Sequence, residues 1–169
     1  MAGRIARAVG PALLTFITYI VFTGSVAPLD LLAGALVGAT VGLIVANLVV
    51  ENPRKLLQIA RFGWLMAYAL YYFLVAEIRA HLDVMKRILH PTMPINPGIV
   101  RVPYGVKTDY AMTAIANSIT NTPGTVVVDL DPDKKFFYVH WIDVKTVDPE
   151  EARRKISLAF ENYAQKVFD

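Results

Sequence analysis

Side chains able to bind a metal or transfer a proton gather in a predicted β-hairpin near the carboxyl end of the chain. His140 lies on a predicted strand, and three aspartates lie near it in the sequence: Asp129, Asp131 and Asp143. A histidine beside carboxylates is the pattern of a metal site or a general base. Asp131 and Asp133, however, flank a predicted turn, where aspartate forms turn hydrogen bonds, and a single histidine on an apolar strand is more often a packing residue. We therefore predict no catalytic residue, metal or cofactor in the hairpin.

Two other polar groups are better explained by local structure than by chemistry. One is a cluster of hydroxyls with no base beside it in the sequence. The other is a set of ionisable groups on one predicted helix, which could form a proton route but is expected to be the wet face of that helix. Their members are Ser118, Thr120, Thr122 and Thr125 in the first group, and Glu77, His81 and Asp83 in the second. Because phosphate-binding and dinucleotide-binding glycine patterns are also absent from the sequence, we predict that the chain is not an enzyme.

These groups belong to an unusually apolar chain. Of its 169 residues, 55% are hydrophobic and only 18% are charged. A soluble domain has about a quarter of its residues charged, so we expect much of this surface to lie in lipid or against partner proteins. That excludes a free cytosolic enzyme. The absence of cysteine further excludes disulfides, thiolate-held iron–sulfur clusters and cysteine zinc sites.

Positive charge is concentrated in the amino-terminal half. Residues 1–90 hold eight Lys and Arg against four Asp and Glu, whereas residues 91–169 hold nine against ten. Basic residues that flank apolar runs belong at lipid headgroups. The excess positive charge therefore indicates a membrane partner and not a nucleic-acid-binding face.

Two uncharged runs in this half are long enough to cross a bilayer as helices. Twenty-two residues separate Arg7 from Asp30, and twenty more separate Asp30 from Glu51. At about 1.5 Å per residue, each run covers the roughly 30 Å hydrocarbon core. We predict two transmembrane helices joined by a tight turn at 25–30, because no cleavage site before a polar chain marks the first run as a signal peptide.

A third helix is predicted from about Pro53 to His90, membrane-embedded at first and amphipathic afterwards. Its uncharged part, 62–76, is too short to span alone, and a span over 56–76 needs Arg61 to reach the headgroups. Two full spans with the third helix lying at the interface place all eight basic residues on one side, whereas three full spans place three of them outside. We therefore predict a multi-pass protein of the cell membrane with a cytoplasmic carboxyl-terminal half.

Three glycines repeat at intervals of four in the second span: Gly34, Gly38 and Gly42. This spacing places them on one helix face, where the missing side chains let another helix approach closely. We predict a helix-packing interface on this face. We favour a helix of a different protein as its occupant, and the alternative is the chain's own first span. Because neither span holds an ionisable group in mid-bilayer, we do not expect the chain to conduct ions alone.

The polar half is predicted to be a small α+β domain. Pro91, Pro94 and Pro97 break the preceding helix. They define a linker at 91–97 between a membrane domain at 1–90 and the α+β domain at 98–169. The predicted elements are a strand at 98–102, a helix capped by Thr108 or Asp109, strands at 125–131 and 136–144, and a helix begun by Asp148 and Pro149, in the order β-α-β-β-α. Such a domain has a small hydrophobic core, so we expect it to be stabilised by packing against the membrane or a neighbouring protein.

The strand predicted over 136–144 is apolar on both faces. Phe137, Val139 and Trp141 share one face, and Tyr138 and His140 share the other. We predict that Phe137, Val139 and Trp141 face a partner protein while the other face covers the domain's own helices. The alternative is a strand buried on both faces within its own fold.

Three segments carry a likeness to a known family: PTMPINPGIVRVP at 91–103, ANSITNTPGT at 116–125, and the strand residues Tyr138, Val139 and His140. Together with the apolar helices before them, they resemble the E subunit of the multisubunit Mrp-type cation/proton antiporters over nearly the whole chain. The resemblance implies an accessory subunit without established catalytic residues, bound to large proton-translocating subunits and to other small hydrophobic ones. Homologous subunits also occur, mainly in archaea, in respiratory complexes that contain a membrane-bound hydrogenase or a related ferredoxin-oxidising module.

These observations predict a non-catalytic accessory subunit of a membrane complex that exchanges Na⁺ for protons, either as a stand-alone antiporter or as the antiporter module of a hydrogenase-like respiratory complex. The alternative is a membrane-anchored module that senses an ion or small ligand through its β-hairpin. Purification separates the two, because a subunit copurifies with its partners.

Overall fold

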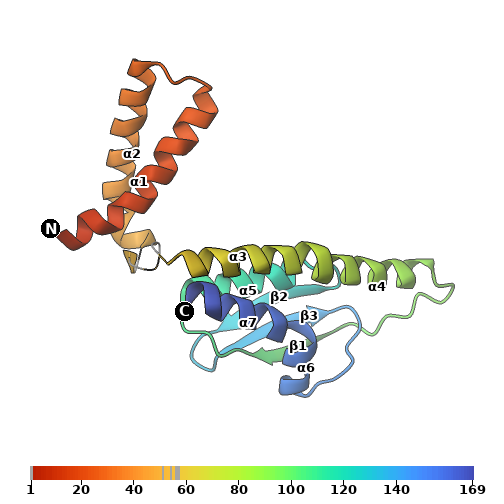
Figure 1. Cartoon of the computed structure of the whole chain (residues 1–169). Helices are drawn as coiled ribbons and strands as arrows, with labels where there is room; N and C mark the ends of the chain where they lie inside the picture. The colour runs from red at the N-terminus through yellow and green to blue at the C-terminus, as the bar shows by residue number, and fades with distance from the viewer. Residues whose placement is uncertain (1, 51, 54, 56–57) are drawn as a thin grey trace. The chain divides into compact units, whose positions relative to one another are not determined.

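The computed structural model describes residues 2–50, 52, 53, 55 and 58–169 (Figure 1). The chain divides into two compact units between Ile59 and Ala60. The first unit contains a helical hairpin, and the second contains most of a long helix together with the α+β domain.

The hairpin consists of two apolar helices, α1 (Ala2–Thr23) and α2 (Pro28–Val49). Gly24 ends α1 with a positive φ of 63°, and its amide donates to the Ile20 carbonyl at 3.0 Å. Pro28 begins α2, where its missing amide costs no hydrogen bond. Both helices are long and apolar enough to cross a membrane, as the two uncharged runs predict.

A continuous helix of 31 residues, Ile59–Leu89, follows. It comprises α3 (Ile59–Tyr71), a π-helical turn η2 (Tyr72–Ala76) and α4 (Glu77–Leu89), and we refer to it below as the long helix. Its length and composition also suffice to cross a membrane. The single helix predicted from about Pro53 is present from Ile59 onward, and part of its predicted start lies outside the described residues.

The α+β domain is built on an antiparallel three-stranded sheet in the order β1-β3-β2. Its elements are β1 (Gly98–Pro103), α5 (Asp109–Asn121), β2 (Thr125–Asp131), β3 (Phe136–Trp141), α6 (Pro149–Ile156) and α7 (Leu158–Phe168). The predicted last helix is therefore two helices, because the backbone of Ser157, at φ −121° and ψ −23°, leaves the helical region between them. The strand predicted to reach residue 144 ends at Trp141.

Two side chains begin helices of this domain as their residue types predict. Thr108 Oγ1 accepts a hydrogen bond from the Ala111 amide at 3.3 Å, and Asp148 Oδ1 accepts one from the Glu151 amide at 2.8 Å. Both satisfy amides that a helix start leaves without a partner. These caps fix where α5 and α6 leave the preceding loops.

The core of the domain lies between one face of the sheet and the helices that cover it. Its buried members include Val100, Val102, Ile115, Ile119, Phe137, Val139, Phe160 and Ala164. Tyr68 of α3 belongs to the same core. The long helix therefore packs with the α+β domain, along which it lies (Figure 1). The membrane domain predicted over 1–90 accordingly divides after Ile59, because most of its third helix packs on the polar half.

Candidate functional site: the long helix and the surfaces around it

The glycine face of α2 is filled by α1. Gly34, Gly38 and Gly42 are buried. A methyl group added at Gly38 would lie 2.7 Å from the carbonyl oxygen of Ala12, and one added at Gly42 would lie 2.7 Å from that of Ala8. The predicted helix-packing interface is therefore present, but its occupant is the chain's own first span. The foreign helix that we favoured finds no room on this face, because the α1 backbone already lies in close contact with it.

The inner face of the long helix is an aromatic surface that packs on α7. The Tyr68 ring stacks on Tyr163 with centroids 5.6 Å apart and planes 6° apart, and Tyr71 lies 5.2 Å from the same ring. Phe160 contacts Tyr68, Tyr71 and Tyr72 at centroid distances of 6.1–6.4 Å. Aromatic pairs at these separations add to the free energy of burial. This cluster fixes α3 and η2 to the domain.

The predicted hydroxyl cluster serves helix ends and turns, and one member also helps to hold the long helix. Tyr68 Oη and Ser118 Oγ lie 2.5 Å apart. Thr122 Oγ1 donates to the Ser118 carbonyl at 2.6 Å, and Thr125 Oγ1 donates to the Ile119 carbonyl at 2.8 Å. Hydroxyls bound in this way to backbone carbonyls complete local structure, as the sequence predicts.

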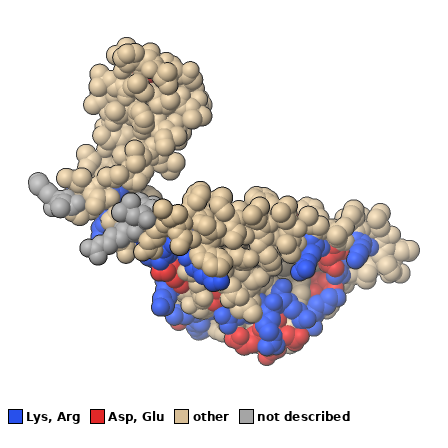
Figure 2. Space-filling view, in the orientation of Figure 1, with Lys and Arg blue, Asp and Glu red and all other residues tan. Residues whose placement is uncertain are grey.

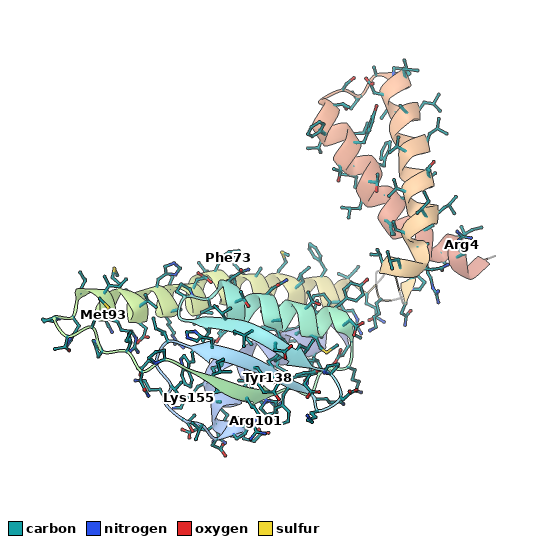
Figure 3. The ribbon with its side chains drawn as sticks, turned by 180° about the vertical axis from the view of Figure 1, so that it is seen from behind. Arg4, Phe73, Met93, Arg101, Tyr138 and Lys155 are labelled. Carbon is teal, nitrogen blue, oxygen red and sulfur yellow. The ribbon has the colours of Figure 1, made fainter. Side chains whose placement is uncertain are left out.

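The outer face of the long helix is apolar along its whole length. Figure 2 shows the edge of this helix that points away from the sheet in uncharged tan, and Figure 3 shows Phe73 pointing outward from it. The large side chains exposed on α3, η2 and α4 are Ile59, Phe62, Trp64, Leu65, Met66, Leu70, Phe73, Leu74, Ile78, Leu82, Met85, Ile88 and Leu89. An apolar strip of this length is far larger than a water-exposed helix usually carries. The inner face of α3 is aromatic, and apart from Arg61 the charged residues of the helix begin at Glu77 in α4.

A chain of charges fixes the carboxyl end of the long helix to the sheet. The Arg87 guanidinium donates to Asp83 at 2.9 and 3.1 Å, to Asp143 at 2.6 Å and to the Pro94 carbonyl at 2.9 Å. Lys145 pairs with the same Asp143 carboxylate. Asp83, a member of the predicted wet face, is bound to Arg87, and its side chain is 57% exposed.

The other two groups of that face lie one helical turn apart. His81 Nδ1 lies 2.9 Å from the Glu77 carbonyl oxygen and 3.3 Å from a Glu77 carboxylate oxygen. Tyr72 donates to the Glu77 carboxylate. The His81 side chain is 64% exposed and the Glu77 side chain only 18% exposed, so His81 is the member of this pair that lies at the surface.

Acid should release the contact at the end of α4. Hydrogen bonds from Lys145 and Arg87 hold the pKa of the Asp143 carboxyl below its ordinary value of 3.8. A carboxyl with a lowered pKa stabilises the fold at every pH above its ordinary pKa, and this contribution is lost as pH falls through the lowered value. We expect Asp143→Asn to melt below the wild-type chain at pH 5–8 and the difference to shrink below about pH 4. Asp133→Asn, on the exposed turn, is the control and should show no such gap. A gap for Asp143→Asn that persists unchanged at pH 3 would contradict this assignment.

The candidate metal cluster of the hairpin is dispersed. His140 pairs across the sheet with Ile99 on β1 and Val126 on β2. Asp131 accepts from the Lys134 amide at 2.9 Å within the turn, and Asp129 accepts from the amide next to it. Among the residues that the structure describes, no group of three or more His, Cys, Asp or Glu side chains is arranged to hold a metal ion.

The predicted partner-facing side of β3 lies inside the domain. Phe137 and Val139 are 0% exposed in the chain's own core, and Trp141 is partly buried against it. This prediction is therefore wrong for Phe137 and Val139. Both faces of the strand are apolar, and Ile115 and Ile119 of α5 belong to the same buried core as Phe137 and Val139.

A buried ion pair holds α6, α7 and the loop after β1 together, and sequence reasoning missed it. Glu161 is fully buried and accepts from the Arg153 guanidinium at 2.8 and 2.9 Å and from the Gly105 amide at 2.7 Å. Nothing in the spacing distinguishes Glu161 from an exposed helix residue. The tyrosines of the long helix did carry a signal, since Tyr68, Tyr71 and Tyr72 follow helical spacing on one face.

A family of Na⁺/H⁺ ion antiporter subunits matches residues 12–167, which include α2, the long helix and the sheet. The chain belongs to this family. The resemblance to the E subunit of such antiporters is thereby confirmed. The match begins within α1 and extends to the last turn of α7.

Two relatives and one solved structure agree with this assignment. The E subunit of the Na⁺/H⁺ antiporter of Alkalihalophilus pseudofirmus is 36% identical over 126 residues, which are 75% of this chain and 78% of that protein. The E1 subunit of the Na⁺/H⁺ antiporter of Staphylococcus haemolyticus is 38% identical over 86 residues, 51% of this chain and 54% of that protein. A chain of the membrane-bound sulfane sulfur reductase (MBS), an archaeal respiratory membrane complex, superposes with a TM-score of 0.76 at 35% identity, covering 96% of this chain and 99% of that one.

Proposed function

We propose that the chain is a non-catalytic subunit of a multisubunit membrane complex that exchanges Na⁺ for protons. Membership of the Na⁺/H⁺ antiporter subunit family carries this proposal. Within this complex, the chain contributes to assembly. Its hairpin anchors the chain in the bilayer, and its α+β domain supports one face of the complex. The partners are the large proton-translocating subunits and other hydrophobic subunits.

The composition of the hairpin supports a role outside the ion path. No Asp, Glu, Lys or Arg lies between Arg7 and Asp30 or between Asp30 and Glu51. Asp30 itself lies in the first turn of α2, where Ser25 donates to its carboxylate. A path for ions through lipid needs ionisable or coordinating groups at mid-bilayer. We therefore place the transport path in partner subunits.

The packing of the long helix supports two spans with this helix lying along the cytoplasmic surface of the membrane. Its inner face contacts the α+β domain from Arg61, whose guanidinium donates to the Val167 carbonyl at 2.8 Å, to Arg87. A helix that crossed the bilayer would carry this attached, charged domain into the hydrocarbon, at a prohibitive cost. With its outer face in lipid, the helix instead buries its apolar strip and keeps the domain in water. All eight basic residues of 1–90 then lie on the cytoplasmic side.

The host complex that we favour is a respiratory one. The MBS chain matches nearly all of this chain in both sequence and fold. The Alkalihalophilus relative, which is named as part of an antiporter, matches three quarters of it. We therefore propose that this chain is a subunit of a respiratory membrane complex of the MBS kind.

Purification tests the proposed role. The full chain with an affinity tag should copurify from its native membranes with large antiporter-type subunits. Removal of the chain should reduce the amount of assembled complex and the Na⁺/H⁺ exchange of membrane vesicles in the same proportion. A chain that purifies alone, from cells whose antiporter complex is intact without it, would contradict the proposal and favour a separate sensing module.

We expect His140→Gln to leave transport near normal for each assembled complex. His140 lies between Ile99 and Val126 on the sheet, so we expect glutamine to change only the local packing. The measurement is Na⁺/H⁺ exchange in vesicles, divided by the amount of complex determined from its composition. An intact complex whose exchange is abolished by this one change would make the hairpin part of the mechanism.

A further inference from the structure

A cavity of about 390 Å³ lies beneath the inner flank of the long helix, between this helix, the turn that precedes β2, the end of β3, and α6 with the start of α7. Its lining combines aromatic walls with charged side chains. The members that matter here are Tyr71, Arg79, Asp83, Trp141, Arg154 and Lys155. It is thus a site with both an apolar and a cationic part.

The charge of this lining is positive and incompletely neutralised. Among the described residues, no ion pair or hydrogen bond engages the guanidinium of Arg79 or of Arg154. Asp83, the acidic residue of the lining, is bound by Arg87 at 2.9 and 3.1 Å. Lys155 lies 3.6 Å from Glu151, in a pair that is over 40% exposed on both sides. Two arginines that share a cavity without a counter-ion favour an anion, and the planar guanidinium suits phosphate oxygens in particular.

The depth of the cavity in the proposed arrangement points to the source of that phosphate. A helix with its side chains is about 10 Å across, and the headgroup layer on each side of the hydrocarbon core is roughly 5–8 Å thick. If the outer face of the long helix lies in the acyl chains, its inner flank lies at the level of the lipid phosphates. Arg79 directly follows the outward, half-exposed Ile78 on α4, so cation and apolar strip adjoin each other.

We propose that this cavity binds the phosphate group of an acidic phospholipid, with Arg79 and Arg154 as its ligands, Lys155 adding positive charge, and the acyl chains lying along the outer face of the long helix beside Phe73 and Ile78. This inference rests on the interfacial position given to the long helix under the proposed function. A bound lipid would join α4 to α6 and so fix the domain against the membrane surface.

The test uses the full-length chain in a neutral detergent, titrated with dioleoylphosphatidylglycerol, with the bound lipid counted by native mass spectrometry. The variant is Arg79→Gln with Arg154→Gln. The control is Lys86→Gln with Arg101→Gln, which removes the same charge outside the cavity lining. We expect the wild-type chain and the control to bind one phosphatidylglycerol with similar affinity, and the variant to bind it at least about tenfold more weakly. Phosphatidylcholine should bind far more weakly than phosphatidylglycerol to the wild-type chain and to the control.

Several results would overturn the inference. They are the absence of a bound phosphatidylglycerol on the wild-type chain, an equal loss in the control, or binding of inorganic phosphate or glycerol phosphate as tight as that of the lipid, which would make the ligand a free phosphate. Copurification with antiporter subunits is measured in a separate experiment, because it tests the proposed function and not the lipid site. A chain that binds phosphatidylglycerol through both arginines but does not copurify supports this inference and contradicts the proposed function.

Discussion

Gly38→Leu should separate the two helices of the hairpin and abolish assembly of the chain into its complex. A side chain at this position would begin 2.7 Å from the Ala12 carbonyl oxygen, and that oxygen belongs to the backbone of α1, which cannot rotate away. Overpacking of this kind costs about 1–3 kcal/mol in protein interiors, and we expect the upper end here because the contact is backbone to backbone. The variant should still insert into the membrane, since leucine is more apolar than glycine.

The measurement is the composition and melting temperature of the complex purified through a tag on this chain. Gly3→Leu is the matched control in the same hairpin, because a methyl group added at Gly3 has no atom within 4 Å. We expect the control to purify normally and Gly38→Leu to give little or no complex. A Gly38→Leu complex with unchanged composition and melting temperature would show that α1 and α2 do not pack through this face.

Glu161→Ala should strongly destabilise the α+β domain. It removes the buried carboxylate that pairs with Arg153 and that accepts from the Gly105 amide, so it leaves that amide without this partner and a partly buried guanidinium with only the exposed Glu150 carboxylate. Breaking a buried ion pair by deleting one member costs about 3–5 kcal/mol. Because the Arg153 side chain is 26% exposed, water can hydrate part of its guanidinium in the variant. We therefore expect a loss of unfolding free energy at the lower end of this range, about 3 kcal/mol.

Glu151→Ala serves as the comparison for this variant. Glu151 pairs with Lys155 at 3.6 Å on the exposed side of α6, with both side chains over 40% exposed. Such a surface pair contributes less than about 1 kcal/mol. Denaturant unfolding of the full-length chain in detergent, followed by circular dichroism, measures both variants. If both substitutions lowered the free energy of unfolding equally, the structural role assigned to Glu161 would be wrong.

Uncharged length was enough to predict the membrane hairpin, because a run of twenty apolar residues in lipid has few alternatives to a helix. Turn and cap residues likewise predicted where α5 and α6 begin, since Thr108 and Asp148 bond their own helix. These features depend only on residues close together in the sequence. They can therefore be predicted without knowledge of the tertiary structure.

Contacts between elements that are far apart in the sequence could not be predicted from local patterns. The spacing of Gly34, Gly38 and Gly42 predicts a close helix contact but carries no information on whether α1 or a foreign helix makes it. Both faces of β3 are apolar, so alternation alone cannot choose between Phe137 and Tyr138 as the buried one. Length and hydropathy describe the long helix as a candidate span, whereas its attachment to Tyr163 depends on a residue almost a hundred positions away.

The break at Ser157 and the pair of Glu161 with Arg153 were not predicted from the sequence. The periodic apolar pattern continues through Ser157, so the sequence predicts one helix, whereas the backbone of Ser157 leaves the helical region and divides it into α6 and α7. A charged side chain in such a pattern is normally placed in solvent. Glu161 is instead buried, where the Gly105 amide and Arg153 of α6 bind its carboxylate.

We propose that the chain crosses the membrane twice and that the long helix lies along the cytoplasmic surface. The chain has no cysteine, so single-cysteine variants report without background. Gln58 and His90 flank the long helix and are exposed. Gln58→Cys and His90→Cys are to be labelled with a membrane-impermeant maleimide in intact cells and in inverted membrane vesicles. We predict that both react in the inverted vesicles and that neither reacts in intact cells. Labelling of the two positions from opposite sides would show that the helix crosses the bilayer and would contradict the account.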